Sequence, residues 1–311
     1  MSDGRVLVTG GFPAMLETWM FDPASSAVGP GPRLMEGRQS HLAVTLADGS
    51  VLIAGGVGLG DAQGPLATAE LLDPVAGTVR SAGMLQVPRL AAEAVRLDDG
   101  RVLIAGGAGA GDGGPVTKLE VFDPALSTFS LVQTEDSVAG ALVKLDDGRV
   151  VVAGESSAWI FDPENDSVSG IPVSGEYWSG SPVLLTSGEV LMTGGCCAPG
   201  GDALHRAGVL DVATGGFTAV DDLNHGRVNH TATRLADGRV LIVGGIGSQD
   251  GPREVPTQTA EVYDPETRSF IQASQPVAVR SAHQANLLAD GRVLITGGWR
   301  SGTPSAEVFT P

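Results

Sequence analysis

Arginine recurs at one position of a repeating pattern, where it could bind an acidic ligand. The four arginines each precede an apolar stretch, and they are Arg38, Arg89, Arg227 and Arg280. A guanidinium group can hold a carboxylate or a phosphate through two parallel hydrogen bonds, so four of them on one rim could bind an anion. Alternatively, each arginine packs across to the next repeat and pairs with one of the 36 acidic residues. The sequence leaves both interpretations open.

Histidine recurs three residues after three of these arginines, as His41, His230 and His283. Three imidazoles facing one channel could bind a transition metal, or one of them could act as a general base. Metal binding would require ring nitrogens that converge on one point, about 2 Å from each nitrogen. The alternative is a hydrogen bond between neighbouring repeats. We predict neither a metal site nor a bound cofactor.

Irregular positions are stronger candidates for a site, because the repeat does not require them. Candidate acids or bases are Glu176, Tyr177 and His205. Candidate ligand-binding residues, besides the four arginines, are Trp178, Arg206, His225, Arg253, Trp299 and Arg300. Charged groups beside aromatic rings can form the wall of a ligand site through stacking and cation–π contacts. This cluster would belong to the fifth, sixth and seventh repeats.

The elements that position these residues come from a stretch repeated along the whole chain. Asp290-Gly-Arg-Val-Leu-Ile-Thr-Gly-Gly298 has copies that begin at residues 3, 48, 99, 147, 187 and 237, spaced 40 to 53 residues apart. A period in this range is typical of a repeat architecture. An apolar alternation precedes most copies of the Asp-Gly turn, and an apolar run follows it. This pattern predicts a hairpin with a two-residue type I′ turn at Asp-Gly.

Most repeats continue with a third strand that ends in Asp-Pro, as at Asp264-Pro265 in the sixth repeat, and then with a short fourth strand. Four antiparallel strands in each period predict an all-β, seven-bladed β-propeller that forms a single domain over residues 1–311. The complete blades would span 38–85, 89–135, 137–173, 176–223 and 226–276. Residues 1–34 would form a first blade without its innermost strand, and residues 280–311 a last blade without its outermost strand.

The pattern His-x-Ala-x-x-Leu-x-Asp-Gly-Arg-Val-Leu-Ile-x-Gly-Gly, followed by Ala-Glu-Val-Tyr-Asp-Pro, resembles a kelch repeat of the bacterial type. The resemblance is best in residues 226–276 and 280–311, and it implies a propeller related to the central domain of galactose oxidase. In adaptor-type kelch domains, arginines at a similar position bind acidic peptides, and kelch-like propellers also include sugar epimerases. The copper site of galactose oxidase needs two tyrosines, two histidines and a cysteine crosslinked to a tyrosine. This chain offers only Tyr177 and Tyr263, and Tyr263 belongs to an Asp-Pro turn on the opposite face, so the sequence does not favour copper radical chemistry.

The variable loops indicate which end of the propeller carries function. Turns between first and second strands and between third and fourth strands are short and repetitive, whereas the other connections vary in length. We therefore predict binding of a ligand or protein partner at the channel mouth on the variable side. The alternative is an enzyme that performs acid–base chemistry on a sugar or metabolite in the same pocket.

Charge and composition restrict the partners. The formal net charge of −17 disfavours nucleic acid and anionic membranes, which attract clustered lysine and arginine. We expect a small polar or anionic ligand, or an acidic peptide, and a soluble monomer whose incomplete blades form a seam for possible self-association. The sequence as written has no signal peptide, which predicts a cytoplasmic protein, or a secreted one if the N-terminus has been trimmed.

Overall fold

The structure is a computed structural model of the 311-residue chain. It describes residues 1, 3–13, 15–58, 64–111, 113–174, 180–195, 203–248, 254–276, 278–298 and 306–311. Within these ranges every regular element is a β-strand, and no helix able to cross a membrane is found there. The chain forms two compact units. Unit 1 is Met1–Val152 with Trp159–Ser169, and unit 2 is Ala153–Ala158 with Gly170–Pro311.

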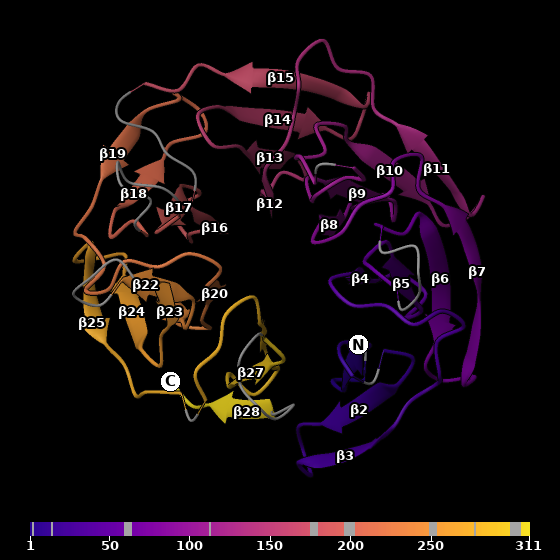
Figure 1. Ribbon diagram of the computed structural model, residues 1–311. Coiled ribbons are helices and arrows are strands. Elements are labelled where there is room, and N and C mark those ends of the chain that lie inside the picture. Colours follow the sequence, from indigo (N-terminus) through magenta and orange to yellow (C-terminus); the bar gives the residue numbers. More distant parts are fainter. Residues whose placement is uncertain are drawn as a thin grey trace. The chain divides into compact units, whose positions relative to one another are not determined.

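Antiparallel sheets follow one another along the chain, each with its strands in chain order (Figure 1). The first sheet is β1 (Val6–Thr9), β2 (Thr18–Asp22) and β3 (Ala27–Pro30). The second is β4 (Leu42–Thr45), β5 (Val51–Ala54), β6 (Thr68–Asp73) and β7 (Thr78–Met84). The third is β8 (Glu93–Arg96), β9 (Val102–Ala105), β10 (Glu120–Asp123) and β11 (Thr128–Leu131). The fourth is β12 (Ala141–Lys144), β13 (Val150–Ala153), β14 (Ala158–Asp162) and β15 (Ser167–Ile171).

The remaining blades belong to unit 2. The fifth sheet is β16 (Ser181–Leu184), β17 (Val190–Thr193), β18 (Ala207–Leu210) and β19 (Phe217–Ala219). The sixth is β20 (Thr231–Arg234), β21 (Val240–Val243), β24 (Ala260–Asp264) and β25 (Ser269–Gln272), and its long loop holds the hairpin β22 (Ile246–Ser248) and β23 (Glu254–Pro256). The seventh is β26 (Gln284–Leu287), β27 (Val293–Thr296) and β28 (Ala306–Phe309).

This strand order is that of a seven-bladed β-propeller, as the repeat predicts. In the described part of the chain, the first and the seventh sheets contain three strands, and the other blades contain four. The motifs assign the strands: β1 carries the run that ends in Gly-Gly, which is the second strand of a complete blade, and β28 carries the third.

The core lies between successive blades of each unit. The second strand of each complete blade is buried on both faces, so that alternate side chains pack against the blades before and after it. In unit 1, Leu52 of β5 shares a cluster with Ile104 of β9. In unit 2, Leu241 of β21 shares one with Ile295 of β27. Burial on both faces explains why these strands are continuous apolar runs.

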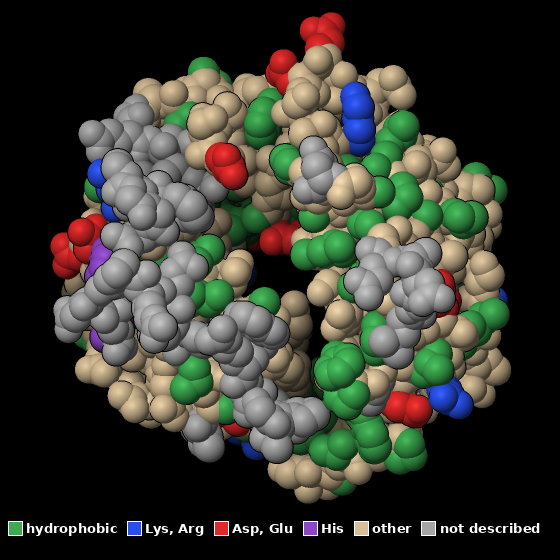
Figure 2. Space-filling view, in the orientation of Figure 1, with side chains coloured by type: hydrophobic (Ala, Val, Ile, Leu, Met, Phe, Trp, Pro, Cys, Tyr) green, Lys and Arg blue, Asp and Glu red, His purple; other side chains and the backbone are tan. Residues whose placement is uncertain are grey.

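Exposed apolar side chains gather at the start of the chain. Among the described large hydrophobic residues with exposed side chains, Phe12, Trp19, Val28 and Met35 belong to the first sheet or to the loops that adjoin it. On the face shown in Figure 2, hydrophobic side chains lie over the part of the view that β2 and β3 occupy in Figure 1.

The Asp-Gly hairpin turn differs from the prediction. Gly49 has a φ of 87°, but Asp48 is not among the described residues with positive φ, which a type I′ turn would require at both positions. Gly49 N donates to Leu46 O at 3.1 Å, and Leu46 N donates to Ser50 O at 2.8 Å. The loop therefore has three residues, a type I turn followed by a left-handed glycine. The Asp48 carboxylate caps it by accepting the Ser50 N–H at 2.9 Å, a bond that type I geometry permits.

The Asp-Pro turns behave as predicted, because the aspartate satisfies the backbone of its own turn. Asp73 Oδ1 accepts the N–H groups of Val75 and Ala76, each at 2.9 Å. This arrangement recurs at Asp123 and Asp264. The third strand is thus ended by local hydrogen bonds alone, which keeps this end of each blade short.

Tyr263 departs from the pattern of its strand position and leads to a stability prediction. Four other blades have phenylalanine there, as Phe21, Phe122, Phe161 and Phe309. Tyr263 is 0% exposed, its ring centroid lies 5.0 Å from that of Phe270, and its hydroxyl has no hydrogen-bond partner. Burial raises the pKa of this phenol, so the hydroxyl is protonated and unsatisfied at neutral pH.

We expect Tyr263→Phe to leave the free energy of unfolding unchanged or to raise it by about 1 kcal/mol, because it removes a buried polar group without a partner. Urea unfolding followed by circular dichroism measures the change. Phe122→Tyr is the matched control, and it should lower the free energy of unfolding by introducing the same hydroxyl. A clear loss of stability in Tyr263→Phe would contradict this account.

Candidate functional site

The four repeated arginines are buried ion-pair partners of the third strand. Arg38, Arg89, Arg227 and Arg280 are each 0% exposed. Each pairs through Nη2 with a glutamate of its own blade, at 2.8 Å to Glu70, 2.6 Å to Glu120, 2.5 Å to Glu261 and 2.8 Å to Glu307, respectively. Nη1 donates to a glycine carbonyl at the end of the second strand: Gly55, Gly106, Gly244 or Gly297.

The paired glutamate also holds the loop that enters the blade. Glu120 accepts the N–H groups of Gln86 at 2.7 Å and Val87 at 3.1 Å. Glu70 and Glu261 bind the corresponding loops in the same way. Burial lowers the pKa of Arg89, and the carboxylate of Glu120 opposes this shift. The guanidinium groups are thus paired with acidic residues inside the protein, as the alternative interpretation predicts. The predicted direction was wrong, because each arginine pairs within its own blade and not across to the next one.

Arginine and glutamate occur together. Four blades contain both residues, whereas the fourth blade has Ser137 and Trp159 in their places. The fifth has Tyr177 and Gly208. An arginine that bound only an external ligand would not need a glutamate in its blade. The occurrence of both residues in the same blades therefore indicates an ion pair internal to each blade.

The three repeated histidines connect successive blades. The Nε2 atoms of His41, His230 and His283 lie 2.6 Å from Thr9 Oγ1, 3.0 Å from Thr193 Oγ1 and 2.9 Å from Thr231 Oγ1, respectively. Burial, with a nearby arginine, lowers the pKa to about 4 for His41, about 3 for His230 and about 4 for His283. All three rings are neutral at physiological pH, and each bonds to a different threonine.

These histidines do not assemble a metal site. Nowhere in the described ranges do three or more His, Cys, Asp or Glu side chains come together in a group that could hold a metal ion. Each Nε2 is already occupied by its threonine hydroxyl. The arrangement agrees with the alternative of a hydrogen bond between neighbouring blades.

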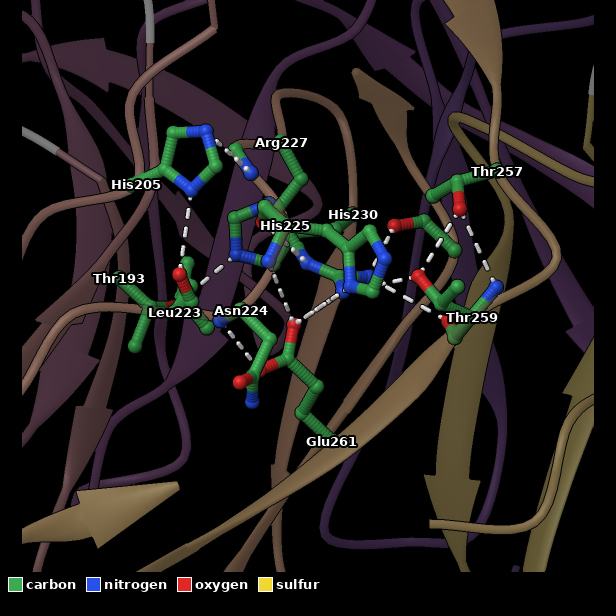
Figure 3. A network of polar contacts seen from close by, with 12 residues as sticks. Thr193, His205, Leu223, Asn224, His225, Arg227, His230, Thr257, Thr259 and Glu261 are labelled. Carbon is green, nitrogen blue, oxygen red and sulfur yellow. Dashed lines mark hydrogen bonds and ion pairs between the residues drawn. The ribbon is translucent and has the colours of Figure 1, made fainter. Parts of the chain in front are cut away.

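Two loops of unit 2 bring other predicted site residues together (Figure 3). Segment 203–206 precedes β18, and segment 223–227 leads from β19 towards β20. His205 joins them: its Nδ1 lies 3.1 Å from Leu223 O, and its Nε2 accepts the Gly226 N–H at 3.2 Å. A carbonyl can only accept, so the proton of the neutral ring is on Nδ1. Both nitrogens are therefore engaged, which leaves neither for proton transfer unless a bond breaks.

His225 has a freer ring than His205. Its Nδ1 lies 3.8 Å from Glu261 Oε1, and its side chain is 32% exposed. Glu261 is fully buried and is held by Arg227 Nη2 at 2.5 Å and by Asn224 N and Nδ2, each at 2.7 Å. The imidazole thus turns one edge to a fixed carboxylate, and the ring is partly open to solvent.

Some predicted residues adjoin this cluster, and others lie outside the described residues. Arg206 is exposed and is next to His205 in the chain. The predicted positions that fall outside the described residues are Glu176, Tyr177, Trp178, Arg253, Trp299 and Arg300.

Glu93 is a titratable residue that the sequence did not single out as a candidate site residue. It begins β8, and its Oε2 accepts the Leu142 N–H of β12 at 2.8 Å. The surrounding protein raises the pKa of its carboxyl, although solvent reaches the side chain. Comparison of the repeats could have identified it, because Glu93 is charged whereas the residues at the same position of the other repeats are uncharged: Leu42, Ala141, Ser181, Thr231 and Gln284.

Comparison with solved structures identifies the architecture. A fungal alcohol oxidase of the AA5 family, solved in complex with copper, matches with a TM-score of 0.76 and 19% sequence identity. The match covers 99% of this chain and 72% of that chain. The likeness is one of fold. This propeller matches no protein-family model and no curated protein.

The buried ion pairs give the first prediction from this site. We expect Glu120→Gln to lower the free energy of unfolding by roughly 3 kcal/mol, because it leaves the Arg89 guanidinium buried without a counter-charge. Chemical denaturation measures the change. Glu135→Gln, at an exposed position of the same blade, should change the value by less than about 0.5 kcal/mol. Equal effects of the two substitutions would show that the pair has no special structural role.

The buried histidines predict a loss of stability in acid. Their pKa values are about 3 to 4 in the folded protein, against about 6.5 in an unfolded chain. Below pH 6.5 the unfolded chain therefore binds protons that the folded protein does not, and stability falls as the pH drops towards 4. Each histidine contributes a loss of roughly 3 kcal/mol over this window.

His230→Gln should therefore have a shallower dependence of unfolding free energy on pH between 7 and 4 than the unsubstituted protein. The remaining titratable groups are the same in both proteins. The difference between the two curves therefore isolates the contribution of His230. Parallel curves would contradict the prediction.

Proposed function

We propose that this propeller binds a polar ligand bearing a carboxylate at the two loops of unit 2 that carry His205, Arg206, Asn224 and His225. The ligand is a small anion or an acidic peptide segment, since both present the same group. The observation that carries the proposal is the fixed position of His225, whose partly exposed ring lies against Glu261 at 3.8 Å.

An exposed cationic side chain at these loops supports an anionic ligand. Arg206 is exposed beside His205, in a protein of net charge −17. A guanidinium group can hold a carboxylate through two parallel hydrogen bonds. The four buried arginines are not part of the proposed site, since each already has a glutamate partner.

Rigidity supports binding at the same place. Glu261 accepts three hydrogen bonds from Asn224 and His225 in addition to that from Arg227, and His205 bonds to the backbone at Leu223 and Gly226. A loop held in this way loses little conformational entropy when a ligand binds.

An enzyme is the second candidate, favoured by the pairing of His225 with a carboxylate. A histidine oriented by a carboxylate is a common general base. In that case His225 would move the proton, Glu261 would orient the ring, and Arg206 would bind the anionic part of a sugar acid or similar metabolite. The copper of the alcohol oxidase does not fit the residues described: each repeated imidazole already bonds to a threonine through Nε2, and Tyr263 is buried against Phe270.

Isothermal titration calorimetry with citrate and with a glutamate-rich peptide tests the proposal. We expect His225→Ala to raise the Kd for the bound probe by about tenfold, through loss of one hydrogen bond to a charged group. Arg80→Gln is the control, because it removes an exposed positive charge from β7 of the other unit.

Absence of binding by either probe, or equal Kd values for the two variants, would overturn the proposal. Following the bound ligand by NMR over several hours separates the two candidates. Turnover that disappears in His225→Gln would favour the enzyme.

A further inference from the structure

A second surface, in unit 1, combines exposed apolar side chains with carboxylates that the repeat does not require. Phe12 is 73% exposed and Met35 is 64% exposed. They belong to adjoining loops, because Gly11 N donates to Arg38 O at 3.1 Å and Leu34 N donates to Leu16 O at 2.9 Å. We call Phe12, Glu17, Met35 and Glu36 the Phe12–Met35 patch.

The residue types of Met35 and Glu36 differ from those of the other repeats, but their backbone is held in place. The corresponding dipeptides are Gln86-Val87 in the third blade, Asn224-His225 in the sixth and Val277-Ala278 in the seventh. In the third and sixth blades a polar residue stands where Met35 exposes its thioether. Glu70 holds this loop by accepting the N–H groups of Met35 at 2.8 Å and Glu36 at 3.1 Å. The apolar side chain is therefore presented from a rigid backbone.

The patch carries surplus negative charge. Arg38 Nη2 contacts both Glu70, at 2.8 Å, and Glu36, at 3.3 Å. One guanidinium thus faces two carboxylates, and the Glu36 side chain is 41% exposed. The hydroxyl of Thr68 donates to Glu36. Glu17 pairs with Arg33 at 3.4 Å and adds no net charge. A binding partner therefore meets apolar surface beside an accessible negative group.

We propose that the Phe12–Met35 patch binds a peptide segment in which a basic side chain adjoins an apolar one. The apolar side chain packs on Met35 and Phe12, and the basic group pairs with Glu36. Charge complementarity selects this occupant over a second copy of the chain, since two copies would each bring a net charge of −17. Met is well suited to such a surface, because its flexible thioether adapts to different apolar groups.

Fluorescence polarisation with two labelled peptides tests this inference: one alternates leucine and lysine, and the other alternates leucine and glutamate. We expect the protein to bind the lysine peptide only. Met35→Gln, which installs the residue of the third blade, and Glu36→Gln should each raise the Kd about tenfold. Glu164→Gln removes an exposed carboxylate from a turn at another site and should leave the Kd unchanged.

Met35→Gln distinguishes docking from general attraction to an acidic protein, because it changes no charge. Thermal unfolding checks that all variants are folded, as expected for exposed positions. Binding of the lysine peptide that is equally tight in Met35→Gln and Glu164→Gln would overturn the inference, and so would failure to bind it at all. Sedimentation that shows a dimer abolished by Met35→Gln would assign the patch to self-association instead. Because the patch lies in unit 1, none of these outcomes bears on the site in unit 2.

Discussion

A guanidinium group that is removed from water needs a carboxylate partner and acceptors for its other N–H groups. Four blades of this protein are arranged to supply the carboxylate and a backbone carbonyl. The buried arginine joins the start of the first strand to the end of the second strand and to the third strand. Its glutamate then holds the incoming loop. Desolvation makes such a pair costly to break, so the geometry of all these segments is fixed together.

The same constraint explains how variable residues acquire defined positions. Glu70 and Glu261 hold the backbones of Met35-Glu36 and Asn224-His225 through equivalent hydrogen bonds. The side chains at these positions differ completely in chemistry, whereas their backbones do not. Function can therefore vary without rebuilding the loop. The two proposed binding surfaces are two uses of one structural position.

The sequence was informative about the fold because each strand signal is local and repeated. Alternation, Asp-Gly and Asp-Pro locate strands and turns, and seven copies predict seven blades. The turn type at Asp48 was wrong because Asp-Gly permits two geometries, and the three-residue loop lets the aspartate cap the backbone. The arginines were harder to interpret. Their partners stand about 30 residues away, and only the comparison of blades with and without Glu120 or its equivalents could reveal them. Glu93 was missed since its contact crosses between blades.

Each ion pair draws on a single blade and the loop that enters it, as Arg89, Glu120 and Gln86 illustrate. The repeat that is structurally self-sufficient therefore begins at the incoming loop rather than at the first strand. Chimaeras cut just after a fourth strand would carry the complete ion pair and its loop together, while cuts before the first strand would separate the glutamate from the amides it binds. Segments cut just after a fourth strand could therefore be duplicated or exchanged with their ion pairs intact. This offers a route by which such proteins could diversify their recognition surfaces while each blade stays stable.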